Sequence, residues 1–182
     1  MLKYVLLGAL NYQSMTGYQL KQFIDTSAGH FWHALPSQIY RTPDSLEKEK
    51  LLTSEIEPQE DRPDRRVYSI TAAGREDLRR WLSEPLTEIT PAKEPFLLRL
   101  FFSAQLDKQT VLTQLRLQRA LRQGQIAVFR EIKAMIASTV EAQPELRRDA
   151  LMWEATRRVG EMTEEAIVAW LDETIQRVEE EF

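Results

Sequence analysis

The stretch between residues 36 and 82 decides the fold. It reads, in order, PSQIYRTPDSLEKEKLL (36–52), TSEIEPQ (53–59), EDRPDR (60–65), RVYSI (66–70) and TAAGREDLRRWL (71–82). The first and last segments carry apolar residues at helical spacing, and the second and fourth alternate as strands do. The pattern predicts a helix, a hairpin with an arginine-rich tip and a further helix, which is the layout of a winged helix-turn-helix.

Helices are also expected before this stretch. Apolar residues recur at helical spacing over 2–12, and Thr16 then begins a second helix that ends near Ala28 and Gly29. The Thr16 hydroxyl can accept a backbone N–H while Gln19 returns the bond, which is a capping box. Further along, Pro36 suits the first position of the third helix. We expect strands over 53–58 and 65–70, and a fourth helix over 72–83 that Thr71 caps.

The second half of the chain is predicted to be helical. Residues 84–93 carry proline without helical periodicity and are the expected linker. PFLLRLFFSAQL (95–106) is apolar on nearly every face, which predicts burial on both sides. Long helices are expected over 107–140, capped by Asp107, and over 146–180 after the break at Pro144. The last helix carries two apolar stripes, one of Met152, Ala155, Val159, Met162, Ala166 and Trp170 and one of Thr163, Ile167, Leu171, Ile175 and Val178.

The predicted fold is therefore mainly α with a small β-hairpin. It comprises an N-terminal winged helix-turn-helix domain (1–83), a linker (84–93) and a C-terminal domain of long antiparallel helices (94–182). Two apolar faces on one long helix need two partners. One partner is a neighbouring helix of the same chain, and the simplest second partner is another subunit, so we expect a homodimer.

Composition argues against an enzyme. The 182 residues include no cysteine, two histidines and only 6 glycines, all isolated. No phosphate-binding loop, catalytic triad or metal-ligand set can be assembled from them, so no cofactor and no metal are expected. His30, Trp32 and His33 are interpreted as a packed aromatic connector, with Phe31 and Trp32 as an alternative ligand-pocket lining.

Neither a secretory signal nor a membrane span is recognisable, which predicts a cytoplasmic protein without a membrane partner.

Charge sets a limit on how the chain can bind DNA. The net charge is −4, and residues 1–85 hold 11 Lys/Arg against 12 Asp/Glu. Local placement matters more than the sum, because physiological salt screens charges beyond about 8–10 Å. Arg41 and the arginines of the hairpin tip form a small basic footprint. We therefore expect modest affinity that needs two copies acting together.

The motifs resemble the PadR family of bacterial transcriptional regulators, most closely its AphA-like subgroup with a long helical C-terminal domain. The resemblance covers about residues 2–83 and is carried by LLGAL, TGYQLKQFI, HFWHALPSQIYR, LEKEKLL, EPQEDRPDRRVYSIT and TAAGREDLRRWL, in family order and spacing. It implies a homodimeric regulator, expected to be a repressor, that binds double-stranded DNA at a palindromic operator. In such proteins a small hydrophobic or aromatic ligand sometimes tunes binding.

Three segments supply the candidate DNA contacts. They are the start of the second helix, the third helix and the hairpin, called here the wing, and their candidate residues are Thr16, Tyr18, Gln19, Ser37, Gln38, Tyr40, Arg41, Thr42, Arg62, Arg65 and Arg66. Glutamine can bond an adenine edge and arginine a guanine edge or a phosphate. The alternative for the wing arginines is a solubilising tip, paired with Asp61 and Asp64.

Pro43 departs from the family pattern. A proline inside a helix removes an N–H and clashes with the carbonyl four residues earlier. Two outcomes are open: a kink at Thr42, or a helix that restarts near Asp44. Lys50 stands where many relatives have glycine. Pro43, Asp44 and the acidic balance of the chain support an alternative function, in which a winged-helix dimer acts as a protein–protein adaptor with weakened or lost DNA binding.

Overall fold

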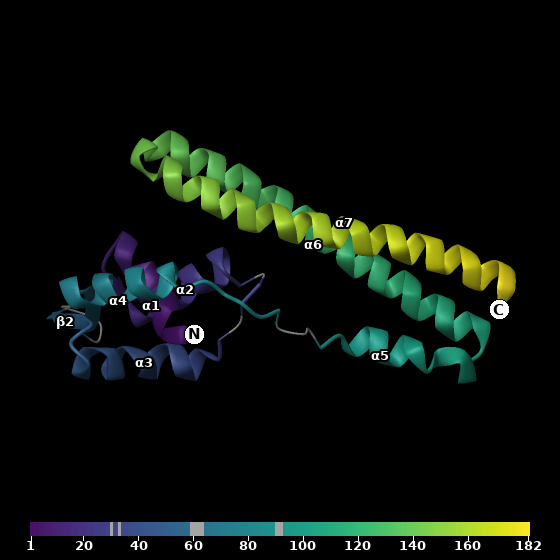
Figure 1. Cartoon of the computed structure of the whole chain (residues 1–182), viewed down its shortest axis with the longest axis horizontal. Coiled ribbons are helices and arrows are strands. Elements are labelled where there is room, and N and C mark those ends of the chain that lie inside the picture. The colour runs from purple at the N-terminus through teal and green to yellow at the C-terminus, as the bar shows by residue number, and fades with distance from the viewer. Residues whose placement is uncertain (30, 33, 59–63, 90–92) are drawn as a thin grey trace. The chain divides into compact units, whose positions relative to one another are not determined.

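The computed structural model describes residues 1–29, 31–32, 34–58, 64–89 and 93–182. The chain divides into two compact units, Met1–Thr90 and Pro91–Phe182. The N-terminal unit is a small helical domain with a sheet, and the C-terminal unit is built on two long helices (Figure 1). Each unit has its own hydrophobic cluster, so each is described by itself.

The N-terminal unit has the predicted winged-helix order. Its elements are α1 (Leu2–Tyr12), β1 (Met15–Thr16), α2 (Gly17–Ser27), α3 (Pro36–Lys48), β2 (Leu52–Glu57), β3 (Arg65–Ile70) and α4 (Ala72–Ser83). The four helices and the hairpin are confirmed. The short strand β1 was not expected; it pairs antiparallel with β3, so the hairpin is part of a three-stranded sheet of order β1-β3-β2.

Local capping explains where two of these helices begin. Thr16 Oγ1 accepts from the backbone N–H of Gln19 at 3.2 Å, and Gln19 Oε1 accepts from the backbone N–H of Thr16 at 2.8 Å. Thr71 Oγ1 accepts from the backbone N–H of Gly74 at 3.0 Å at the start of α4. Both predicted caps are confirmed, because a cap depends only on residues close in sequence.

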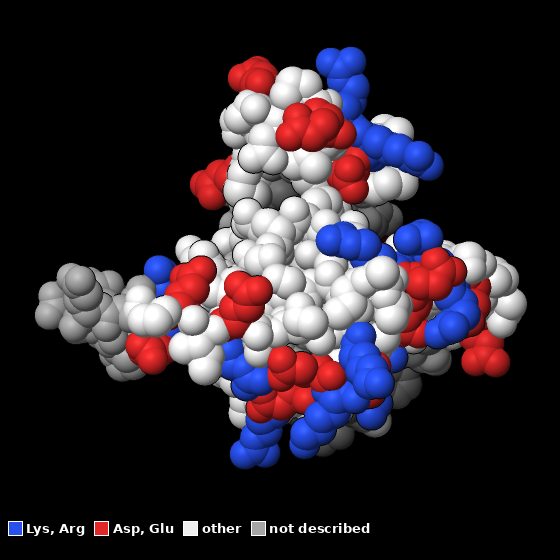
Figure 2. Space-filling view, turned by 90° about the vertical axis from the view of Figure 1, so that its left-hand side faces the viewer, with Lys and Arg blue, Asp and Glu red and all other residues white. Residues whose placement is uncertain are grey.

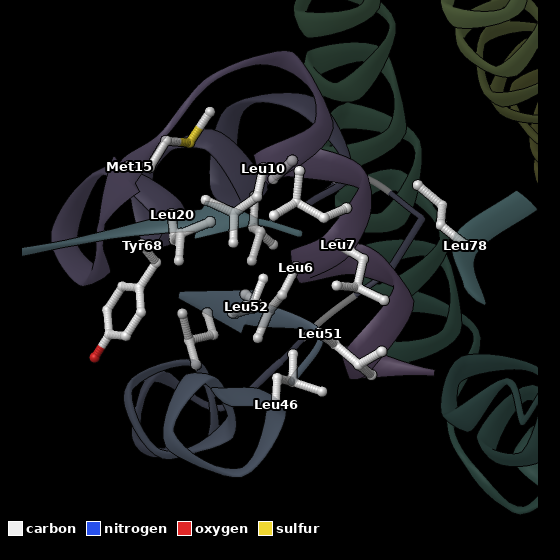
Figure 3. Packing of buried hydrophobic residues seen from close by; sticks show 14 residues of the cluster. Leu6, Leu7, Leu10, Met15, Leu20, Leu46, Leu51, Leu52, Tyr68 and Leu78 are labelled. Atoms are coloured by element: carbon white, nitrogen blue, oxygen red, sulfur yellow. The ribbon is translucent and has the colours of Figure 1, made fainter. Parts of the chain in front are cut away.

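Buried side chains from every helix and from the sheet form the core of the N-terminal unit. Figure 3 shows leucines of α1 facing Leu46 of α3, Leu52 of β2 and Tyr68 of β3. The fully enclosed members, all at most 2% exposed, are Leu6, Leu7, Ala9, Leu10, Met15, Leu20, Ile24, Ile39, Leu46 and Leu52. Trp32 packs partly buried against this cluster, in agreement with an aromatic connector. His30 and His33 lie outside the described residues.

The C-terminal unit consists of α5 (Pro95–Phe101), the short 3-10 helix η1 (Ser103–Gln105), α6 (Lys108–Ala142), the 3-10 helix η2 (Pro144–Leu146) and α7 (Arg147–Glu181). Helices α6 and α7 run antiparallel along one another (Figure 1). Asp107 caps α6 as predicted, since its Oδ1 accepts from the backbone N–H of Thr110 at 2.9 Å. Among the described residues, no helix is long and apolar enough to cross a membrane.

The expectation that residues 95–106 are buried on both sides was wrong. Only Phe96 and Leu100 of α5 pack against the cluster of Val111, Leu115 and Leu171. Their neighbours Leu97, Leu98, Phe101, Phe102 and Leu106 are 41–80% exposed. One chain supplies a partner for only one face of α5, so its other face stays uncovered in the single chain.

The two stripes of α7 have different environments. Ile167, Leu171, Ile175 and Val178 pack against α5 and α6. The stripe that includes Met152, Val159 and Met162 is 53–64% exposed at these three residues. A single chain therefore covers one of the two predicted apolar faces.

A buried ion cluster lies on α7 where Arg157 Nη1 donates to the Phe129 carbonyl oxygen of α6 at 3.4 Å, and no motif predicted this cluster. Arg157 is 1% exposed and binds Glu154 through two hydrogen bonds of 2.7 Å. Its Nη1 also donates to Glu161 Oε2 at 2.8 Å. These hydrogen bonds from Arg157 lower the pKa of both carboxyls. The buried guanidinium is thus fully compensated, as a buried charge must be.

Candidate nucleic-acid interface

Helix α3 separates its core-facing residues from its outward residues. Ile39, Pro43 and Leu46 are buried and recur at three- and four-residue spacing on one side. The opposite side carries Ser37 and Arg41, both exposed. Gln38 and Tyr40 flank that side and are also exposed, whereas Thr42 is half-buried and its Oγ1 donates to the Gln38 carbonyl oxygen at 2.7 Å. All candidate residues of this helix except Thr42 therefore lie on its solvent side.

Pro43 does not end α3. The helix is continuous over Pro36–Lys48 with the proline inside it. Pro43 is on the buried side, between Ile39 and Leu46, so its ring contributes apolar surface to the core. The helix does not restart at Asp44, whereas the kink at Thr42 stays a prediction.

The turn after α3 connects the helix directly to the wing. Lys50 has φ 60°, in the left-handed region. The backbone N–H of Lys50 donates to the Glu47 carbonyl oxygen and that of Leu51 to the Leu46 carbonyl oxygen, each at 2.9 Å. These two bonds define a Schellman motif, which usually places glycine where Lys50 stands. The short connection fixes where β2 begins relative to α3.

The start of α2 lies beside α3. The Tyr40 ring lies so close to Gly17 that a Cβ built there would be 3.0 Å from Tyr40 Cδ1. Tyr18 is 68% exposed next to this contact. Thr16 and Gln19 bond each other in the capping box. The structure thus brings the candidate residues of α2 and α3 onto neighbouring surfaces.

The wing arginines differ in their surroundings. Arg65 is exposed, and its Nη2 lies 3.6 Å from Glu57 Oε2 across the hairpin. Arg66 Nη1 lies 2.7 Å from Asp44 Oδ1, and its Nη2 donates to Glu47 Oε2. Both of these carboxylates belong to α3, so the partners of Arg66 are not the hairpin-tip aspartates that the sequence suggested. Arg62 and Asp61 lie outside the described residues.

The charges around these segments are mixed. On the face of the molecule that Figure 2 shows, basic and acidic side chains interleave and no broad basic patch is visible. Arg41 makes no ion pair with any residue in the described part of the chain. The hydrogen bond from Ser54 lowers the pKa of Glu47, which keeps this carboxylate charged beside Arg66 at neutral pH. Within the described residues, no group of three or more His, Asp or Glu side chains could hold a metal ion.

Sequence reasoning missed the partners of Arg66. Asp44 and Glu47 are three residues apart on α3, so they share one side of the helix. Ser54 and Tyr68 face each other in the β2–β3 register, where Arg66 pairs with Ile56. The spacing of Asp44 and Glu47 therefore indicated an acidic side of α3. Only the packing of α3 against the wing shows that this side faces Arg66.

Comparison with known proteins assigns the family. Residues 6–80 match the transcriptional regulator PadR-like family, and residues 92–179 match the C-terminal domain family of virulence activator alpha. The chain is 31% identical to the probable transcriptional regulator Rv1176c of Mycobacterium tuberculosis, over 98% of each chain. It is 24% identical to the negative transcriptional regulator PadR of Bacillus subtilis, over 99% of this chain and 98% of that one. The chain belongs to the PadR-like family of transcriptional regulators.

Solved structures agree on the fold. Bacillus subtilis PadR in complex with operator DNA superposes with a TM-score of 0.83 at 24% identity and covers 97% of both chains. The Vibrio cholerae virulence activator AphA gives a TM-score of 0.70 at 25% identity over 98% of both chains. Bacillus subtilis PadR in complex with p-coumaric acid gives 0.76 at 22% identity, over 98% of this chain and 99% of that one. Membership of the PadR-like family makes the chain a transcriptional regulator and not an enzyme.

Proposed function

We propose that the chain regulates transcription by binding double-stranded DNA with α3 in the major groove. The outward side of α3, with Arg41 exposed and without an ion-pair partner among the described residues, is the observation that carries this proposal. Gln38 and Arg41 are side chains that read base edges or hold phosphates. Ser37, Tyr40 and Thr42 complete the helix contribution.

Phosphate contacts come from the two segments next to α3. The N-terminal end of α2, with Thr16, Tyr18 and Gln19, offers backbone N–H groups and the positive end of the helix dipole. Arg65 on the wing is proposed to contact DNA phosphates, and Arg62, which lies outside the described residues, is proposed to do the same. Such contacts position the protein without reading sequence. Because few Lys and Arg side chains lie on these segments, we expect one chain to bind DNA weakly and two chains together to bind it more tightly.

The functional unit we propose is a homodimer formed by the C-terminal unit. Its support is the apolar surface that one chain leaves uncovered: the outer face of α5, and the stripe of α7 that contains Met152, Val159 and Met162. Contiguous exposed apolar surface of this kind marks an interface. A two-fold dimer presents two copies of α3 to DNA, so its operator is a palindrome with half-sites about one helical turn apart.

Relatives support a proposal for the sign of regulation and for the effector. The Bacillus subtilis relative is a negative regulator, and structures of it contain operator DNA or p-coumaric acid. By analogy the chain is a repressor whose operator affinity a small aromatic or hydrophobic ligand modulates, and it works in the cytoplasm, where bacterial DNA lies. The competing proposal is a protein–protein adaptor, which the carboxylates Asp44 and Glu47 on α3 favour.

A salt titration separates regulator from adaptor. Binding of the full chain to a fluorescent random duplex is measured by anisotropy between low and physiological salt. We expect affinity to fall steeply with salt, and Arg41→Ala to weaken binding while Arg79→Ala, an exposed arginine on α4, does not. Absence of binding at low salt would favour the adaptor.

A further inference from the structure

We propose that Arg66 is a positioning residue that holds the wing against α3, the recognition helix of the proposed DNA complex, and does not itself contact DNA. The inference rests on the proposed DNA-binding function and concerns how the two DNA-facing segments are held together. It departs from the expectation that all wing arginines grip phosphates.

The guanidinium of Arg66 joins three elements. From β3 it reaches α3, where Nη1 lies 2.7 Å from Asp44 Oδ1 and Nη2 donates to Glu47 Oε2. Its Nε donates to Ser54 Oγ on β2 at 2.9 Å. The flat donor fork of arginine suits several acceptors at once, which a lysine cannot reproduce.

Two further contacts fix the arrangement. Ser54 Oγ donates to Glu47 Oε1 at 2.7 Å, so the serine links the carboxylate and the guanidinium. The guanidinium carbon of Arg66 lies 5.1 Å from the centre of the Tyr68 ring, whose side chain is only 7% exposed. Together these residues form a closed network, which we call the Arg66 brace: Asp44, Glu47, Ser54, Arg66 and Tyr68.

Electrostatics argue against moving Arg66 to a phosphate. Within the brace, one guanidinium compensates the carboxylates of Asp44 and Glu47 on the recognition helix. If Arg66 turned to DNA, both carboxylates would be left without it beside a polyanion. Like charges brought close repel, and the field of exposed groups extends about 8–10 Å at physiological salt. The brace is therefore more favourable when Arg66 stays in place as DNA arrives.

Bracing has a direct consequence for binding. The wing and α3 contact different parts of the duplex, so their relative angle decides whether both can be engaged together. A connection preformed in the free protein reduces the ordering cost of binding. Arg65 lies on the same strand, and its Nη2 is 3.6 Å from Glu57 Oε2 across the hairpin, so it is the matched comparison.

The test compares Arg66→Lys, Arg66→Gln, Glu47→Gln and the double variant Arg66→Gln/Glu47→Gln with Arg65→Gln. Each full-length protein is first checked for a cooperative thermal melt, and duplex binding is then titrated at several salt concentrations. We expect Arg66→Lys and Arg66→Gln each to weaken binding by roughly tenfold, because the brace needs the planar set of guanidinium donors and not only the positive charge. The salt slope should stay at the wild-type value. Glu47→Gln should bind no more tightly than wild type, and the double variant no more weakly than Arg66→Gln.

Opposite results identify a phosphate contact. If Arg66→Lys binds like wild type, if Arg66→Gln lowers the salt slope by about one per chain, or if Glu47→Gln tightens binding, the brace proposal is overturned. Arg65→Gln is expected to lower the slope and shows that the assay detects such a loss. If wild type itself shows no salt-dependent binding, the proposed function fails, and the positioning role fails with it.

Discussion

Tyr40 of α3 packs against Gly17 at the first position of α2. A Cβ at Gly17 would lie 3.0 Å from Tyr40 Cδ1 and 3.2 Å from Cε1, which is closer than side chains ordinarily approach. The small residue thus lets the recognition helix and the start of α2 lie in contact. Tyr40 keeps about half of its surface exposed there, at 47%.

Replacing Gly17 by alanine should therefore affect DNA binding more than stability. Alanine in a helix is favoured over glycine by about 0.5–1 kcal/mol, which offsets the crowding at Tyr40. The ring must move outward, and we expect a several-fold loss of duplex affinity with a melting temperature close to wild type. Tyr40→Phe is the control, because it keeps the ring and removes only the hydroxyl. Full affinity in Gly17→Ala would show that the position of Tyr40 does not matter.

Lys50 carries a conformational cost that glycine would remove. Its φ of 60° disfavours side chains by about 1–2 kcal/mol, and part of the gain from glycine is lost to the entropy of the unfolded chain. Lys50→Gly should raise the free energy of unfolding by up to about 1 kcal/mol, measured by urea denaturation. Ser45→Gly, inside α3, should instead lower it by roughly 0.5 kcal/mol. If Lys50→Gly lowers the free energy of unfolding, the claim that the φ of Lys50 costs stability is wrong.

Pro43 offers a test of the continuous helix. Alanine there restores a backbone donor and removes the clash, worth about 3 kcal/mol in a helix interior. It also removes two buried methylenes of the ring, at about 0.8 kcal/mol each. Thermal and urea unfolding of Pro43→Ala should show a net gain of about 1–2 kcal/mol. A loss of stability would mean that packing of the ring between Ile39 and Leu46 outweighs the missing hydrogen bond.

The uncovered stripe of α7 predicts the oligomeric state. Light scattering of the full chain at micromolar concentration should give the mass of two chains of 21.3 kDa each. Val159→Glu places a charge on the stripe at a site 64% exposed in the single chain, so folding is preserved while association weakens. Gln176→Glu adds the same charge to a polar side of α7 and should leave the dimer intact. A monomeric wild-type protein would refute the dimer.

Features that depend on neighbours in sequence were predictable. The caps at Thr16, Thr71 and Asp107 and the helix beginning at Pro36 follow from residues within one turn. The strand β1 is only two residues long and exists because β3 lies beside it, so periodicity could not reveal it. Arg66 was recognisable as a wing residue, but its carboxylate partners lie 19 and 22 positions away. Pairing over that distance is decided by tertiary packing.

The exposure of α5 has the same origin. An apolar run predicts that surface will be buried somewhere, but it does not state which chain supplies the cover. Likewise, helix propensity alone predicts an interruption at Pro43. Helix α3 is nevertheless continuous there, with Pro43 on its buried side. In both cases the tertiary surroundings, which a local pattern does not specify, decided the outcome.

The central claim is that two copies of this chain read a palindromic DNA site through α3. Selection from a pool of random duplexes, followed by sequencing of the bound fraction, tests it most directly. We predict enrichment of an inverted repeat with half-sites about one helical turn apart, bound by two chains, and loss of the enriched sequence in Gln38→Ala/Arg41→Ala. A bound fraction with no sequence in common, or no bound fraction at low salt, would contradict the account.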